Sequence, residues 1–101
     1  MTYKMFIDDE RWPVTDDWII VRSSKEAIEC VLKNGFPQHI NFDHDLGGDD
    51  TSMKFIHWLI DYMLDCELHF PAGFSWDVHS QNPIGAENIR QIMIGMVNEF
   101  S

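Results

Sequence analysis

Acidic residues and histidines occur in three short segments of this sequence that each follow a short apolar run. The first is DDE at residues 8–10, the second is DHD at residues 43–45, and the third begins at His79. Carboxylate oxygens are the ligands that Mg²⁺ prefers, and a histidine nitrogen beside them suits Mn²⁺ or Zn²⁺. Because histidine has an ordinary pKa of about 6.5, two histidines can divide general-base and general-acid roles near neutral pH. These residue types indicate metal-assisted chemistry if the fold brings the segments together.

The pattern of apolar residues and turn formers places the three segments at the ends of predicted strands. Ser23 and Glu26 form a capping box that opens a helix, and Gly35 ends it. Asn82 followed by Pro83 opens the last helix. The sequence thus predicts strands at residues 4–8, 18–22, 39–43 and 74–78, and helices that begin near residues 24, 51 and 83.

Strands that alternate with helices in this way indicate an α/β fold with a parallel sheet and right-handed crossovers. The first two predicted strands lie about nine residues apart, too few for a crossover helix, so we expect a short irregular connection there. Ligands of open parallel sheets bind beyond the carboxyl ends of the strands. If the first and third strands are neighbours, Asp8, Asp9 and residues 43–45 form one acidic pocket with His79 at its edge.

Electrostatics makes such a pocket informative. Two carboxylates about 4 Å apart repel by about 4 kcal/mol at an effective dielectric constant near 20, and a small protein has only about 5–15 kcal/mol of stability. The acids must therefore extend into water, take up protons or share a cation. Taken separately, Asp8 and Asp9 could start a solvated loop, and residues 43–45 could form an Asx-rich turn. Both groups follow apolar strands that should be adjacent, which favours a shared cation.

The helix that begins after Asn82 adds an anion site to this picture. A helix N-terminus presents free N–H groups and partial positive charge, so it attracts phosphate. A phosphate could therefore lie between this helix end and a metal held by the aspartates, with His44 and His79 on either side. Trp12 is near the first acids in sequence and could contact a ligand.

Composition limits the class of protein. A chain of 101 residues with 45% hydrophobic residues fits one globular domain, residues 1–101. The formal net charge of −10 disfavours binding of bulk duplex nucleic acid, which requires a basic surface. No apolar run approaches the roughly 20 residues of a membrane span, and the acidic start does not resemble a secretory signal. We therefore expect a cytoplasmic protein whose two cysteines are reduced.

Three segments, IDDERWP, FDHDLGG and VHSQNPIGAENI, occur in this order and together resemble the cyclic-phosphate-processing receiver-like domains, relatives of the response-regulator receivers. The resemblance covers nearly the whole chain. It implies a small receiver-like (flavodoxin-like) three-layer sandwich, with a four-stranded parallel sheet in the order 2-1-3-4. It also implies an acidic metal site and processing of a cyclic phosphate on a nucleotide or RNA end. No lysine follows Lys54, so aspartyl-phosphate signalling, which uses a late lysine, is not expected.

The resemblance also implies roles for individual residues. Asp8 and Asp9 match metal-binding acids, Asp43 matches the aspartate that receivers phosphorylate, and His44 and His79 match additional histidines of this family. Four further residues fall within its motifs. The predicted site therefore comprises metal ligands Asp8, Asp9 and Asp43, catalytic residues His44, His79 and Asp45, and substrate-binding residues Arg11, Ser80 and Asn82.

The leading functional hypothesis is a phosphoesterase that needs Mg²⁺ or Mn²⁺ and acts on a cyclic phosphate of a nucleotide or RNA terminus. A second hypothesis is a module that binds or sequesters a cyclic nucleotide without hydrolysing it. A third is an acidic interaction protein, for which the net charge of −10 is the motivation. The base, the ring size of the phosphate and the oligomeric state stay open at this point.

Overall fold

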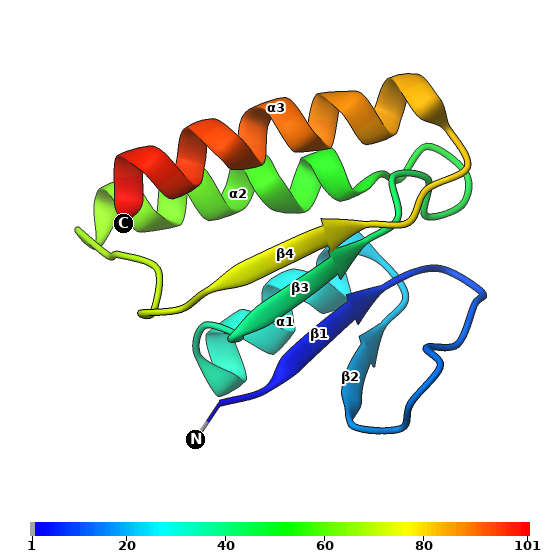
Figure 1. Ribbon diagram of the computed structural model, residues 1–101, viewed down its shortest axis with the longest axis horizontal. Coiled ribbons are helices and arrows are strands. Elements are labelled where there is room, and N and C mark those ends of the chain that lie inside the picture. The colour runs from blue at the N-terminus through cyan, green and yellow to red at the C-terminus, as the bar shows by residue number, and fades with distance from the viewer. Residues whose placement is uncertain (1) are drawn as a thin grey trace.

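The computed structural model of the protein describes residues 2–101, in which four strands and three helices form an α/β fold (Figure 1). All neighbouring strands are parallel, in the order β2-β1-β3-β4. The receiver-like fold and its strand order are therefore confirmed. In chain order the elements are β1 (Lys4–Ile7), β2 (Trp18–Val21), α1 (Ser24–Asn34), β3 (His39–Phe42), α2 (Ser52–Asp65), β4 (Ser75–Val78) and α3 (Pro83–Phe100).

Local signals in the sequence set the ends of α1 and α3. The Ser23 hydroxyl accepts a hydrogen bond from the Glu26 N–H at 3.1 Å, as the capping box predicts. Gly35 ends α1 with a φ of 81°, a left-handed conformation that favours glycine. Asn82 caps α3 through its Oδ1, which accepts from the Gly85 N–H at 2.9 Å. These caps fix where the chain leaves each strand end and enters the next helix.

The three helices share one hydrophobic core on one face of the sheet. Helix α1 packs against α2, and α2 packs against α3. Alternate residues of the central strands, such as Met5 and Ile7 of β1 and Ile40 and Phe42 of β3, belong to this core. Among residues 2–101, no helix combines the length and apolar character needed to cross a membrane.

The opposite face of the sheet carries a different layer. Phe6 alternates with the core residues of β1 and contacts the rings of Trp18 and His79 instead. The connection between β1 and β2, residues 8–17, lies over part of this face and lines a cavity together with Phe6 and Asn41. The three layers are therefore helices, sheet and loop, because right-handed crossovers that progress in one direction along a sheet leave their helices on one side.

Candidate functional site

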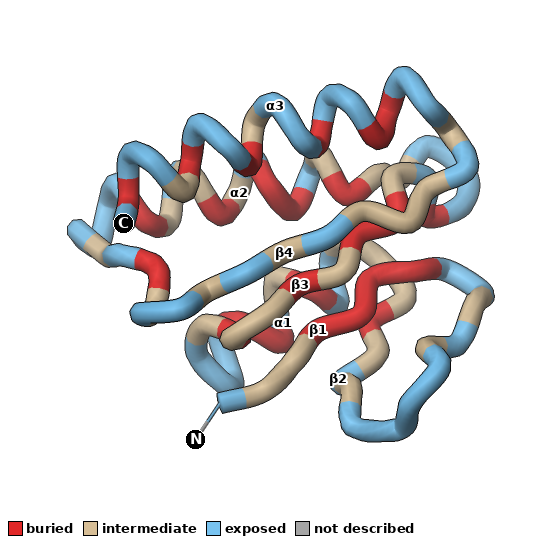
Figure 2. Tube along the Cα trace, viewed as in Figure 1, coloured by how far each residue is buried: buried red, intermediate tan, exposed pale blue. Residues whose placement is uncertain are grey.

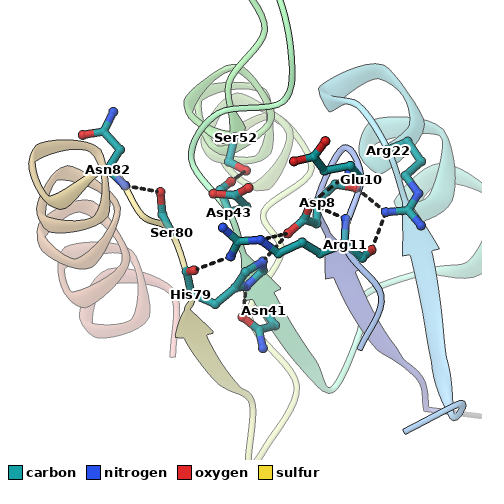
Figure 3. A network of polar contacts seen from close by, with 10 residues as sticks. All are labelled: Asp8, Glu10, Arg11, Arg22, Asn41, Asp43, Ser52, His79, Ser80 and Asn82. Carbon is teal, nitrogen blue, oxygen red and sulfur yellow. Dashed lines mark hydrogen bonds and ion pairs between the residues drawn. The ribbon is translucent and has the colours of Figure 1, made fainter. Parts of the chain in front are cut away.

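One row of side chains follows the ends of three neighbouring strands: Asp8 after β1, Asp43 after β3 and His79 after β4 (Figure 3). The parallel hydrogen bonding continues one residue past the strands. The Asp43 N–H donates to the Ile7 carbonyl at 2.9 Å, and the His79 N–H donates to the Phe42 carbonyl at 2.9 Å. The three residues therefore hold equivalent positions in the sheet, which is why they meet.

The row brings metal-ligating atoms together. Asp8, Asp43 and His79 each offer one ligand atom, and these atoms all lie within 4.8 Å of one another. Asp8 is fully buried and Asp43 is buried, which is unusual for aspartate. Figure 2 shows burial continuing to the carboxyl end of β1, where Asp8 lies. The segments that begin at Asp8, Asp43 and His79 thus meet in the structure, as the predicted strand ends require.

Asp8 is held as a charged group. Its Oδ1 accepts from the N–H groups of Glu10 and Arg11 at 3.0 and 2.9 Å, and its Oδ2 lies 2.8 Å from Nε2 of His79. Burial raises the pKa of Asp8, but these two backbone hydrogen bonds and the His79 contact outweigh it, so its pKa lies below the ordinary value. Asp8 is therefore an anion at neutral pH.

Asp43 has the opposite balance. Burial raises its pKa above the ordinary value, and the negative charge of Asp8 adds to this effect. The Ser80 hydroxyl, His79 and Arg11 lower the pKa of Asp43 but do not offset its burial. The protein groups around Asp43 therefore stabilise its negative charge only in part, and a bound cation would supply the missing positive charge.

Two residues that the sequence analysis did not identify hold the His79 ring. Its Nδ1 lies 2.5 Å from Oδ1 of Asn41, and the ring stacks on Phe6 at a centroid distance of 4.8 Å. Each ring nitrogen therefore contacts an oxygen atom, Oδ1 of Asn41 and Oδ2 of Asp8, and these contacts fix the orientation of the ring. Strand alternation could have identified both partners, because Phe6 and Asn41 occupy the same face as Asp8 and Asp43, two residues earlier in each strand.

The donor set fits a divalent cation. Two carboxylates and one imidazole suit Mn²⁺ well, and the two carboxylates also suit Mg²⁺ with water completing its coordination. The undercompensated charge of Asp43 favours such an ion. Asp9, a predicted ligand, is exposed and lies outside this group of three, whereas His79, predicted as catalytic, lies within it.

Most of the remaining predicted residues line a polar cavity of about 430 Å³ beside the row. Arg11 lines the cavity and also contacts the row. Its Nη1 donates to the His79 carbonyl at 3.2 Å, and its Nε is 4.0 Å from Oδ2 of Asp8. Gly47 and Gly48 also line this cavity and place no side chain in it. The predicted residues on its wall are Asp9, Arg11, Asp43, Asp45, Ser80 and Asn82.

His44 lies apart from His79, on the helix side of the row. Its ring packs against the backbone of Gly85 in the first turn of α3. Its Nδ1 is 3.2 Å from Oδ1 of Asp45, and the other carboxylate oxygen of Asp45 accepts from the Asn82 amide at 3.3 Å. The structure therefore does not bring the two predicted histidines face to face, but it connects His44 to the polar cavity through Asp45.

The close packing of His44 on α3 gives a test of stability. A Cβ atom added at Gly85 would lie 2.4 to 2.7 Å from atoms of the His44 ring, so the ring must move. We expect Gly85→Ala to lower the free energy of unfolding by about 1–3 kcal/mol, the usual cost of overpacking. Urea denaturation measures this change. Gly95→Ala is the matched control on the same helix, because nothing lies within 4 Å of its added Cβ. It should stabilise α3 by about 0.5–1 kcal/mol, and equal effects of the two variants would contradict the packing described here.

Residues 3–95 match the model of the cyclic-phosphate processing receiver domain. The chain belongs to this family. No curated protein and no solved structure shows significant similarity to it. Membership of the cyclic-phosphate processing receiver family implies a cyclic phosphate as the substrate. The row of Asp8, Asp43 and His79 is then a candidate metal site within a member of this family.

Proposed function

We propose that this receiver-like protein is a metal-dependent phosphoesterase that opens a cyclic phosphate on a nucleotide or RNA end. The observation that carries the proposal is the convergence of Asp8, Asp43 and His79 within 4.8 Å, next to a polar cavity that also contains Arg11. A phosphodiester is an anion, and a chain with a net charge of −10 needs a local positive centre to bind it. A cation in the row and the guanidinium of Arg11 would together provide that centre.

Asp8, Asp43 and His79 would hold Mg²⁺ or Mn²⁺, with Asp9 on the cavity wall as the further predicted ligand. When bound, the ion supplies Lewis-acid polarisation of the phosphoryl group. His79 would offer its Nε2 to the ion, and the contact of its Nδ1 with Asn41 would keep the ring in place. Arg11 would hold the phosphate from the side of the row.

The reaction needs one proton transfer in addition to phosphate binding. A water oxygen bonds to phosphorus, one ring P–O bond breaks, and a proton from water reaches the departing ribose oxygen. Asp45 is on the cavity wall and contacts His44, so this pair would take and return the proton. Ser80 and the N-terminus of α3, which Asn82 caps, would orient the phosphate oxygens.

The experiment is incubation of the protein with 2′,3′-cyclic and 3′,5′-cyclic nucleotides, and with a short RNA that ends in a 2′,3′-cyclic phosphate. Mg²⁺, Mn²⁺ or EDTA is present, and ³¹P NMR follows the conversion of diester to monoester. We expect turnover with a metal and none with EDTA. Asp61→Asn, which removes an exposed acid on α2, is the control and should keep full activity.

Other results would decide against hydrolysis. Saturable binding with every ligand recovered intact would support the sequestering module. Neither binding nor turnover, with loss of function on neutralising exposed acids such as Asp16 and Asp17, would support the acidic interaction protein.

A further inference from the structure

A second cavity, which we call the aromatic groove, lies on the face of the sheet that the helices leave uncovered. It has a volume of about 440 Å³, within the roughly 300–1,000 Å³ of small-molecule pockets. The β1–β2 connection forms one side and the sheet forms the other. Its lining residues include Phe6, Arg11, Trp12, Trp18, Asn41 and His79.

The groove keeps aromatic surface open to solvent. Trp12 is 75% exposed, although its ring lies against the Arg22 guanidinium at 4.8 Å. Large exposed aromatic side chains are informative, because they leave apolar area in water that a ligand could cover. A tryptophan that rests on a cation presents a flat, supported surface for stacking.

The connection that carries Trp12 is anchored to the sheet. The indole N–H of Trp18 donates to the Thr15 hydroxyl at 3.0 Å, and that hydroxyl donates to Asp17 at 2.5 Å. Asp17 in turn pairs with Lys4 of β1 at 2.7 Å. A groove whose wall is held in this way loses little conformational entropy when a ligand enters.

The groove and the polar cavity share a wall. Arg11 lines both of them, and His79 belongs to the metal-ligating row and to the groove. Whatever binds at the row is therefore next to the stacking surface. A phosphate carried by an aliphatic alcohol would leave that surface unused, whereas a nucleotide has a planar base attached through its ribose.

We propose that the aromatic groove binds the base of a nucleotide whose phosphate occupies the polar cavity, with Trp12 as the stacking residue. This inference rests on the proposed function for its phosphate site and specifies the substrate as a nucleoside cyclic phosphate. Stacking tolerates every base, because each has a π-face. The groove therefore selects nucleotides over base-free phosphates rather than one base over another.

The test compares two phosphate monoesters that the protein cannot turn over by ring opening. Calorimetry with Mn²⁺ present measures the affinity for adenosine 3′-monophosphate and for glycerol 2-phosphate, which has no base. We expect the nucleotide to bind roughly 5- to 140-fold more tightly, the range that base stacking on an aromatic side chain gives. Trp12→Ala should remove this preference and leave the glycerol phosphate affinity unchanged, and Trp12→Phe should restore most of it.

Two further measurements keep the result interpretable. Trp12→Ala removes the contact with Arg22, and the Mn²⁺ affinity of this variant shows whether that loss disturbs the row. We expect the Mn²⁺ affinity to be unchanged. Leu64→Ala, which truncates an exposed side chain on α2, is the control and should keep the preference for the nucleotide. Equal affinity of the parent protein for both ligands would overturn the inference, as would equal weakening of both ligands by Trp12→Ala.

These outcomes separate the inference from the proposed function. A preference for the nucleotide that depends on Trp12 supports the groove even if no cyclic phosphate is hydrolysed. Conversely, hydrolysis of a base-free cyclic phosphate as efficient as that of a nucleotide supports the phosphoesterase and overturns the groove. A short RNA ending in a cyclic phosphate shows whether the base belongs to a free nucleotide or to an RNA end. Contacts to additional phosphates would make the binding of RNA more sensitive to salt than the binding of a mononucleotide.

Discussion

Asp43→Asn is expected to slow metal-dependent hydrolysis strongly while making the metal-free protein more stable. Loss of a ligand should remove several kcal/mol of transition-state stabilisation, which corresponds to roughly 10²- to 10³-fold in rate. The gain in stability follows from the raised pKa of Asp43, because its charge is unfavourable in the folded protein without a cation. Thermal unfolding in EDTA and the ³¹P assay measure the two effects.

Asp8→Asn is the matched comparison, because it also removes a ligand but from a stabilised carboxylate. Its charge accepts hydrogen bonds from two backbone N–H groups and from His79. We expect the same loss of hydrolysis with a loss of roughly 1.5–3 kcal/mol in unfolding free energy, typical of hydrogen bonds to charged groups. Stabilisation by both substitutions, or destabilisation by both, would contradict the different environments of the two acids.

The pH dependence of this comparison has a defined direction. Because the pKa of Asp43 is raised, its ionisation destabilises the fold as pH increases from about 3.9, the ordinary aspartate value, through its higher folded pKa. The stability advantage of Asp43→Asn should therefore grow through that window and then stay constant. The pKa of Asp8 is lowered, so its contribution is present above the ordinary value and disappears as pH falls through its folded pKa.

Added Mn²⁺ is expected to raise the melting temperature of the parent protein. At an ion concentration 100 times the dissociation constant, binding adds about 2.7 kcal/mol, or roughly 10–20 °C for a domain of about 100 residues. The effect should weaken as pH falls, because Asp43 and His79 must be deprotonated to act as ligands. Differential scanning fluorimetry across a Mn²⁺ titration, followed by EDTA, measures it.

The variants already described are the controls for this shift. Asp43→Asn and Asp8→Asn should respond little to Mn²⁺, and Asp61→Asn should respond as the parent does. An equal shift in all four proteins would place the ion elsewhere on this acidic chain, and would remove the main support for a metal centre at the strand ends.

The parts of the fold that depend on local chemistry were predictable from the sequence. The caps at Ser23 and Asn82 depend on side chains that hydrogen-bond within three residues, so spacing alone identifies them. Strand order followed from the family resemblance, and the meeting of Asp8 with Asp43 followed from that order.

Which of two adjacent site residues joins the row was harder to predict from the sequence. Asp9 and His44 each come one residue after a member of the row, Asp8 or Asp43. Successive residues of an extended chain point to opposite sides, so neither is expected to join the row. His44 accordingly packs against α3, whereas His79 joins the two acids. Whether strand alternation persists past a strand end depends on tertiary hydrogen bonds, here those made by Asp43 and His79, which no local pattern specifies.

The row also determines how the sheet responds to its ligand. Asp8, Asp43 and His79 follow three separate strands, and single backbone hydrogen bonds continue the pairing at their level. The negative charge of Asp8 raises the pKa of Asp43 at the point where these strands separate, and a bound ion would offset that repulsion. An occupied site would join β1, β3 and β4 across their ends, and amide exchange at Asp43 and His79 would then report occupancy directly from the backbone.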